Sequence, residues 1–179
     1  MLLRPIALDD GALLTSALER LSDTTRYRRF LAQRSVFTDV ELEYLTDVDH
    51  HDHEALIAID MRDGEAIGVA RYIRIAPRTA ELAVTVVDDW QGHGVGSLLL
   101  RQLAKRARRA GVDRFVAVTV AGNEPALRLL ARLPRATRLA ADAHVQLGAR
   151  VPGRWKLGPR RRRRRQTLNT VQALTPGAP

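Results

Sequence analysis

The sequence has no cysteine among its 179 residues, and only 4% of them are aromatic. The absence of cysteine excludes disulfide bonds, cysteine-ligated zinc sites and thiol catalysis. No apolar run is long enough to span a bilayer, and residues 1–8 are too short for a secretory signal and are interrupted by Arg4 and Pro5. We therefore expect a cytoplasmic protein. Hydrophobic residues make up 45% of the chain, enough for a core built mainly from aliphatic side chains.

The formal net charge of +9 is confined to one end of the chain. Nine basic residues and no acidic one lie within residues 150–179, so residues 1–149 carry no net charge. We predict one folded domain over residues 1–149 and a basic, disordered tail over residues 150–179. The arginine run 160–165 has the charge to bind nucleic acid or anionic lipid. It lacks interleaved aromatic residues and an apolar helical face, which favours a nonspecific charged tail.

Apolar periodicity and turn signals predict a mixed α/β domain without internal repeats. Helices are expected after Asp9-Asp10, around residues 27–31, from the capping box Thr38–Glu41, between the glycines at 92–96 and Gly111, and from Asn123 to Pro134. Strands are expected at residues 1–8, 54–61, 66–75, 79–87, 115–120 and 137–147. The three strands between residues 54 and 87 are expected to form an antiparallel meander with a hairpin turn at residues 62–65.

The strongest pattern is a strand followed by Gln91-x-x-Gly94-x-Gly96 and then an amphipathic helix. Glycine lets the main chain adopt unusual angles and approach a ligand closely. The first turn of the helix that follows has unpaired N–H groups and the positive end of the helix dipole, which together suit a diphosphate. The alternative is a tight turn without a ligand. No Gly-Lys-Ser/Thr follows, and the glycine spacing does not fit a dinucleotide-binding fingerprint.

This segment resembles the GNAT superfamily of N-acetyltransferases, whose signature is Gln/Arg-x-x-Gly-x-Gly/Ala between the fourth strand and the third helix. Residues 80–87 look like the family's fourth strand, and Asn123 with Ala126 looks like the start of its fourth helix. The resemblance implies a mainly antiparallel, twisted sheet splayed at its centre, with helices on both faces. It also implies acetyl-CoA as co-substrate, no metal, and these cofactor-binding residues: Val86, Val87, Gln91, Gly92, His93, Gly94, Val95, Gly96, Ser97 and Asn123.

A narrower resemblance links the chain to bacterial protein-lysine acetyltransferases. It rests on Leu21-Ser22, Arg26-Tyr27, Phe30, residues 45–50 and His53. In those enzymes a cyclic-nucleotide-binding domain is sometimes fused to the catalytic domain, and 179 residues leave no room for one, so that regulation is not expected here. The resemblance implies a protein lysine as the acceptor, with a polyamine or aminoglycoside as alternatives because acceptor pockets are built from variable loops.

Acetylation of an amine requires a base, since a lysine with an ordinary pKa near 10.4 is protonated at neutral pH. Glu81 interrupts an otherwise apolar strand, so we expect it to be buried, and the family pattern implies that it is the general base. The alternatives are a solvent-facing residue or an ion pair with Arg71 or Arg101. Many family members carry a tyrosine as general acid where this chain has Leu130. That departure keeps open a second hypothesis, a catalytically silent acyl-CoA sensor or a nucleic-acid-associated binding protein.

Residues 47–54, Asp-Val-Asp-His-His-Asp-His-Glu, have the side chains of a metal site, but their spacing matches no established metal motif. We expect a loop with a capping role or an acidic rim at the substrate entrance instead. The basic face of the long helix is expected to be solvated, with Arg101 or Lys105 as candidates for contact with the 3′-phosphate of the coenzyme.

Overall fold

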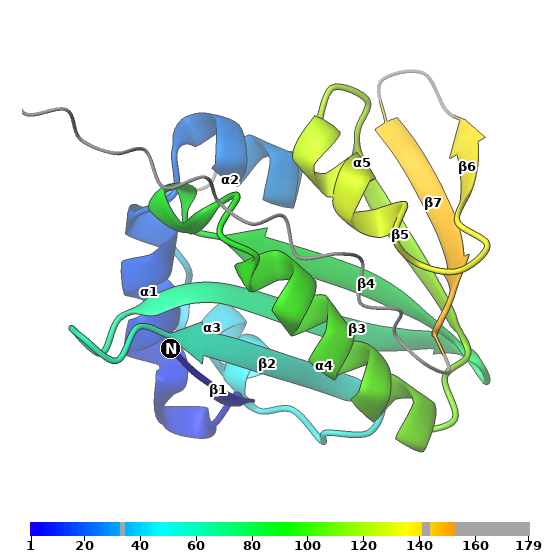
Figure 1. The fold of residues 1–179 in the computed structure, drawn as a ribbon. Coiled ribbons are helices and arrows are strands. Elements are labelled where there is room, and N and C mark those ends of the chain that lie inside the picture. The colour runs from blue at the N-terminus through cyan, green and yellow to red at the C-terminus, as the bar shows by residue number, and fades with distance from the viewer. Residues whose placement is uncertain (33–34, 141–143, 153–179) are drawn as a thin grey trace, which may run out of the picture.

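The computed structural model describes residues 1–32, 35–140 and 144–152, which form one seven-stranded sheet with helices on both faces (Figure 1). The strand order is β1-β2-β3-β4-β5-β7-β6. The strands are β1 Leu2–Pro5, β2 His53–Ile59, β3 Ala66–Ala76, β4 Thr79–Val86, β5 Arg114–Val120, β6 Thr137–Ala140 and β7 His144–Arg150. The helices are α1 Gly11–Glu19, α2 Asp23–Phe30, α3 Asp39–Thr46, α4 Val95–Arg109 and α5 Glu124–Leu130, with 3-10 turns η1 Leu8–Asp10 and η2 Asp88–Trp90.

Strands β2, β3 and β4 form the predicted antiparallel meander, and β1 adds antiparallel to its outer edge. Strand β5 then joins β4 in the parallel direction, through three residue pairs that end at Glu81–Val116. Beyond that pair β4 is bonded to β3 alone, while β5 pairs with β7 along its whole length. The sheet is therefore mainly antiparallel and splits between β4 and β5, as the family resemblance implied.

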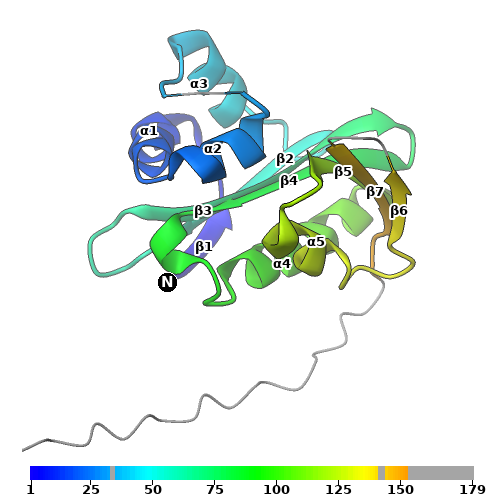
Figure 2. The ribbon, with the colours of Figure 1, turned by 90° about the horizontal axis from the view of Figure 1, so that it is seen from above.

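Helices α1, α2 and α3 cover one face of the sheet, and α4 and α5 cover the other (Figure 2). The larger core lies under α4, where Leu99, Leu100 and Leu103 are fully buried against the strands. Helix α4 ends at the predicted place, since Gly111 has a φ of 81° just after it. Because alternate β4 side chains point to opposite faces, this strand borders both helical layers.

The caps of the first helices explain where they begin. The Thr38–Glu41 capping box is confirmed, with Thr38 Oγ1 accepting from Glu41 N at 3.3 Å and Glu41 Oε2 accepting from Thr38 N at 2.9 Å. Helix α1 begins directly after Asp9-Asp10, as expected, but no side chain of the described residues caps it. Asp10 stands at the N-cap of α1, but its buried carboxylate turns back to an ion pair with Arg4 and to the N–H of Ala7.

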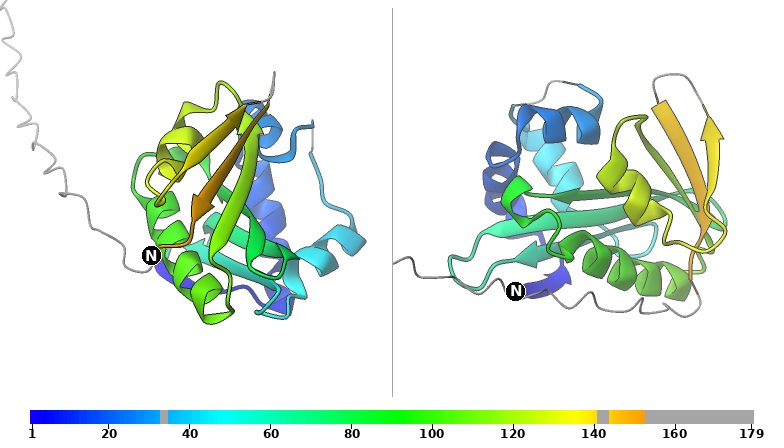
Figure 3. Two further views of the ribbon diagram at one scale, coloured as in Figure 1. Left: turned by 90° about the vertical axis from the view of Figure 1, so that its right-hand side faces the viewer. Right: turned by 45° about the horizontal axis from the view of Figure 1, so that its top comes forward.

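The C-terminal part differs from the single strand predicted for residues 137–147. Two strands, β6 and β7, form a hairpin on the outer side of β5, and Figure 3 shows the three side by side. Strand β7 reaches Arg150 and Val151 is buried, so the fold continues past residue 149. The structure does not describe residues 153–179, so most of the predicted disordered tail, including its arginine run, lies outside the described residues. No helix in the described part of the chain is both long and apolar enough to cross a membrane.

Candidate active site

An opening between β4 and β5 begins directly after the Glu81–Val116 pair. Val87 N donates to Ile67 O of the neighbouring strand at 3.1 Å. Main-chain groups alternate in direction along an antiparallel strand, so the N–H and C=O of Val86 face the opening. The carbonyl of Val86 accepts from Gln91 Nε2 at 3.2 Å. The geometry thus favours Val86 over Val87 as a main-chain contact for a ligand, because the N–H and C=O of Val87 bond to Ile67 and Trp90.

The loop between β4 and α4 has the conformation that its glycines permit. Gly92 and Gly94 have φ values of 74° and 88°, which L-residues with side chains rarely adopt. Gly94 is the N-cap of α4 and supplies no side chain to it. The first N–H of the helix with a partner is that of Leu98, which donates to Gly94 O at 3.0 Å.

Consequently the N–H groups of Val95, Gly96 and Ser97 are unpaired within the described residues. They stand at the positive end of a 15-residue helix, next to Val84 and Val86 of the strand that borders the opening. A Cβ at Gly96 would make only ordinary contacts, 3.4 Å from Leu129 and 3.5 Å from Val86, so packing does not require glycine at this position. This arrangement can hold a diphosphate on main-chain donors.

Asp88 ties the loop to α2, a contact that sequence reasoning missed. Its carboxylate accepts from Ser22 N, Ser22 Oγ and Thr25 Oγ1, each at 2.9 Å. Burial alone would raise the pKa of Asp88, but these hydrogen bonds outweigh burial and hold that pKa below its usual range. Gln91 Nε2 also donates to Thr25 Oγ1, at 3.3 Å, so the signature glutamine positions the loop against both β4 and α2.

Two side chains flank the first turn of α4. Ser97 Oγ accepts from Arg132 Nη1 at 2.7 Å, which brings a guanidinium from beyond α5 to the unpaired N–H groups. Sequence reasoning missed Arg132, because nothing in the local pattern links the end of α5 to the start of α4. His93 is exposed and its Nδ1 contacts Gln91 O at 2.8 Å.

Asn123 is the N-cap of α5, with Oδ1 accepting from Ala126 N at 3.3 Å and Nδ2 donating to Thr119 Oγ1 at 2.8 Å. Both ends of this amide are therefore used to join α5 to β5. Leu130, the residue in place of the common tyrosine, is buried in the core under α4. It offers no acid group to the site.

Glu81 lies on β4 at the last pair before the opening. The expectation that it is buried is wrong, since its side chain is exposed and none of the described residues forms an ion pair with it. It points away from its buried neighbours Ala80 and Leu82, which pack under α4, and so toward the face that carries α1, α2 and α3. A solvent-accessible carboxylate at the split of the sheet can exchange protons with water and with a substrate.

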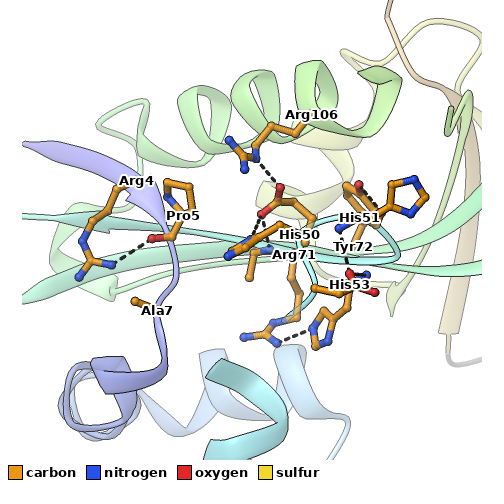
Figure 4. A network of polar contacts seen from close by, with 12 residues as sticks. Arg4, Pro5, Ala7, His50, His51, His53, Arg71, Tyr72 and Arg106 are labelled. Carbon is orange, nitrogen blue, oxygen red and sulfur yellow. Dashed lines mark hydrogen bonds and ion pairs between the residues drawn. The ribbon is translucent and has the colours of Figure 1, made fainter. Parts of the chain in front are cut away.

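Of the two alternatives for residues 47–54, the structure contains the loop with a capping role, which leads into β2 at His53. Asp49 Oδ1 accepts the N–H groups of His51, Asp52 and His53, each at 2.8 Å, and these bonds lower the pKa of Asp49. The described residues contain no cluster of ligands fit for a metal ion. The buried Glu54 carboxylate pairs with Arg106 and with His50, and Figure 4 shows these two side chains.

The sequence of the chain matches the acetyltransferase (GNAT) family over residues 16–133. It is 34% identical over 126 residues to an acetyltransferase of Pseudomonas aeruginosa, covering 69% of this chain and 68% of that one. It is 36% identical over 133 residues to the acetyltransferase Pat of Mycolicibacterium smegmatis, covering 73% of this chain. The matched part is only 40% of the length of Pat.

Solved structures agree with the sequence comparisons. The GNAT domain of S. lividans PAT superposes with a TM-score of 0.77 at 31% identity, over 83% of this chain and 89% of that domain. A Salmonella typhimurium protein solved with acetyl-CoA shares the fold, with a TM-score of 0.69 at 21% identity over 86% of this chain and 95% of that one. The chain therefore belongs to the acetyltransferase (GNAT) family and is an N-acetyltransferase that takes acetyl-CoA as its co-substrate.

Proposed function

We propose that the enzyme transfers the acetyl group by direct attack of a primary amine, with Glu81 as general base. The amine nitrogen forms a bond to the thioester carbon, the C–S bond breaks, and coenzyme A leaves as a thiolate that then takes up a proton. A chain without cysteine has no thiol to form a covalent acetyl-enzyme. The observation that carries the proposal is the opening between β4 and β5, which begins at Glu81.

Acetyl-CoA and the amine approach this opening from different sides. The unpaired N–H groups at the start of α4 hold the diphosphate, and Val86 bonds the pantetheine. The amine approaches from the face of α1–α3, where the Glu81 side chain lies and removes a proton directly or through water. Leu130 leaves the position of the common tyrosine without an acid. We assign protonation of the departing thiolate to water or to coenzyme A itself, because a thiolate is already a good leaving group.

The sequence resemblance implies a protein lysine as the acceptor. The names of the relatives leave that class open. An L-methionine sulfoximine/L-methionine sulfone acetyltransferase of Pseudomonas aeruginosa, whose named substrates are amino-acid derivatives, is 39% identical over 83 residues. That match covers 44% of this chain and 48% of the relative. The acceptor therefore has to be decided from the chemistry of the site.

The role of Glu81 is tested by the pH–rate profile of Glu81→Gln. We expect turnover to fall by roughly 10²–10⁴-fold near neutral pH, and partly to recover at high pH where the amine deprotonates without help. Glu43→Gln removes another exposed carboxylate, on α3, and is the matched control with an unchanged profile. Unchanged turnover of Glu81→Gln at neutral pH would remove Glu81 from the mechanism.

Separate measurement of binding and turnover tests the activity itself. Isothermal titration with acetyl-CoA and an acetylation assay over a panel of amines are expected to give both affinity and transfer. Tight binding of acetyl-CoA without transfer to any amine would favour the silent acyl-CoA sensor. Absence of binding by folded protein would contradict the assignment of the loop as a diphosphate site.

A further inference from the structure

A cavity of about 60 Å³ lies between the sheet and the layer of α1, α2 and α3. Its walls come from these helices, from the segment around Phe37, and from β3 and β4, including Ala83 and Thr85. Aliphatic and aromatic side chains dominate the lining, and Arg29 and Arg71 are its charged members. Among the described residues, the wall of the cavity is thus apolar with positive charge and no acidic group.

Arg71 is the unusual member, because its side chain is buried without a counter-ion. The residue is only 5% exposed, and none of the described carboxylates lies within ion-pair distance of it. Its Nη1 contacts His53 Nε2 at 3.0 Å (Figure 4). Its Nη2 donates to Leu45 O at 3.1 Å, so both partners are neutral acceptors. Burial, and secondarily the charge of Arg71, lowers the pKa of His53, which keeps that ring neutral at neutral pH.

The other buried ionic groups of the protein show the contrast. Among the described residues these are Asp10, which faces Arg4, Asp60, which faces Arg62, and Glu54, which faces Arg106. Burial and the nearby charge of Arg29 lower the pKa of Arg71 to about 10, so at neutral pH the guanidinium still carries its charge. A buried charge without an opposite charge is unfavourable. An anion placed in the cavity would supply the missing partner, and a carboxylate matches the two-pronged donor geometry of a guanidinium.

The cavity also borders the reaction site. Ala83 and Thr85 line it, and both belong to the part of β4 that no longer pairs with β5. Glu81 precedes Ala83 by two residues, so their side chains lie on the same face of the sheet. A ligand anchored at Arg71 would therefore extend along β4 toward the proposed base and the acetyl group.

We propose that the cavity is an acceptor subsite for the carboxylate of a free amino acid, a small primary amine with an apolar carbon skeleton. The inference rests on the proposed transfer reaction and replaces a protein lysine by a smaller acceptor. Arg71 binds the carboxylate, Arg29 adds positive charge at the wall, and the apolar lining receives the carbon chain. The amine is left at the opening of the sheet.

The test compares acids with matched amides on the full chain. Leucine, methionine and 6-aminohexanoate are assayed as acetyl acceptors beside leucinamide, methioninamide and 6-aminohexanamide, with a lysine-containing peptide as a further acceptor. We expect kcat/KM for the acids to exceed that for the amides by roughly ten- to a hundredfold, the value of a hydrogen bond to a charged group. The preferred chain length then reports the distance from Arg71 to the thioester.

Variants assign the preference to Arg71. Arg71→Met is expected to abolish the preference for acids while the affinity for acetyl-CoA stays unchanged, and Arg71→Lys is expected to keep part of it. Arg109→Met, which removes an exposed charge from α4, is the control with an unchanged preference. The acid–amide comparison on the unaltered protein remains decisive even where Arg71→Met does not fold.

Equal rates for acids and amides would overturn the proposal, as would a peptide lysine acetylated tenfold better than every amino acid. If no amine is acetylated, the proposed function fails, and the cavity is tested separately by titrating leucine and 4-methylpentanoate into the protein. Binding that disappears in Arg71→Met supports the carboxylate subsite. No binding to the unaltered protein overturns it.

Discussion

Gly94, in the loop before α4, offers the sharpest test of the proposed diphosphate site. A substitution at this position separates backbone strain from steric contact. Gly94 has a φ of 88°, and a Cβ added there meets no heavy atom within 4 Å. The substitution Gly94→Ala therefore changes little except the conformational preference of the main chain. An L-residue in this left-handed region costs about 1–2 kcal/mol. We expect the Tm to fall by roughly 2–8 °C in a chain of this size.

The same strain should weaken acetyl-CoA binding. When the main chain rotates to relieve the strain in Gly94→Ala, the N–H groups at the start of α4 no longer point at the diphosphate. Loss of one hydrogen bond to a charged phosphate oxygen costs about 1.5–3 kcal/mol, so the Kd should rise by roughly ten- to a hundredfold. Isothermal titration and thermal unfolding measure the two effects separately.

Gly64→Ala is the matched control. Gly64 has a φ of 78° in the turn between β2 and β3, and its added Cβ also meets nothing within 4 Å. This variant should lose similar stability and bind acetyl-CoA normally. Equal, unchanged affinities in both variants, alongside equal losses of stability, would refute the assignment of the loop as the diphosphate site.

Two further predictions concern the contacts around this loop. Arg132→Met removes the guanidinium beside Ser97, so the KM for acetyl-CoA should rise severalfold and become less sensitive to salt while the KM for the acceptor is unchanged; an unaltered KM for acetyl-CoA would contradict the contact. Asp88→Asn should lower the Tm at neutral pH, because the lowered pKa of Asp88 means that its ionised form stabilises the fold. That stabilisation is complete above the ordinary pKa of 3.8 and is lost as the pH falls through the lower pKa of the folded state, so the Tm difference should shrink in acid; a constant difference from pH 7 to pH 2 would contradict this account.

Features with a local physical cause were predictable from the sequence. The Thr38–Glu41 capping box, the turn at residues 62–65 and the glycine loop each lie within a few residues, and the structure contains all three. The split of the sheet was inferred by resemblance, since its cause is the pairing of β4 with β5, which are far apart in the chain. The exposure of Glu81 was mispredicted because apolar neighbours in a strand indicate burial of their own face only.

Contacts between distant segments account for what was missed. Asp88 reaches Ser22 and Thr25 across more than 60 residues, and Arg132 reaches Ser97 across 35. No local spacing encodes such contacts. Arg71 gave a weak signal in the sequence, as a charged residue inside an apolar strand, and was expected only as an ion-pair partner of Glu81.

The alternation of β4 explains how one strand can serve two substrates. Its even-numbered residues pack under α4, and the main chain of Val86 faces the opening beside the anion-binding loop. The side chains of Glu81, Ala83 and Thr85 face the other layer, where the cavity and Arg71 lie. Acetyl-CoA and the acceptor can therefore bind on opposite sides of the strand without sharing contacts, and they meet where β5 departs. On this reasoning, changes at Arg71 should alter which amine is acetylated without altering acetyl-CoA affinity, and changes at Gly94 should do the reverse.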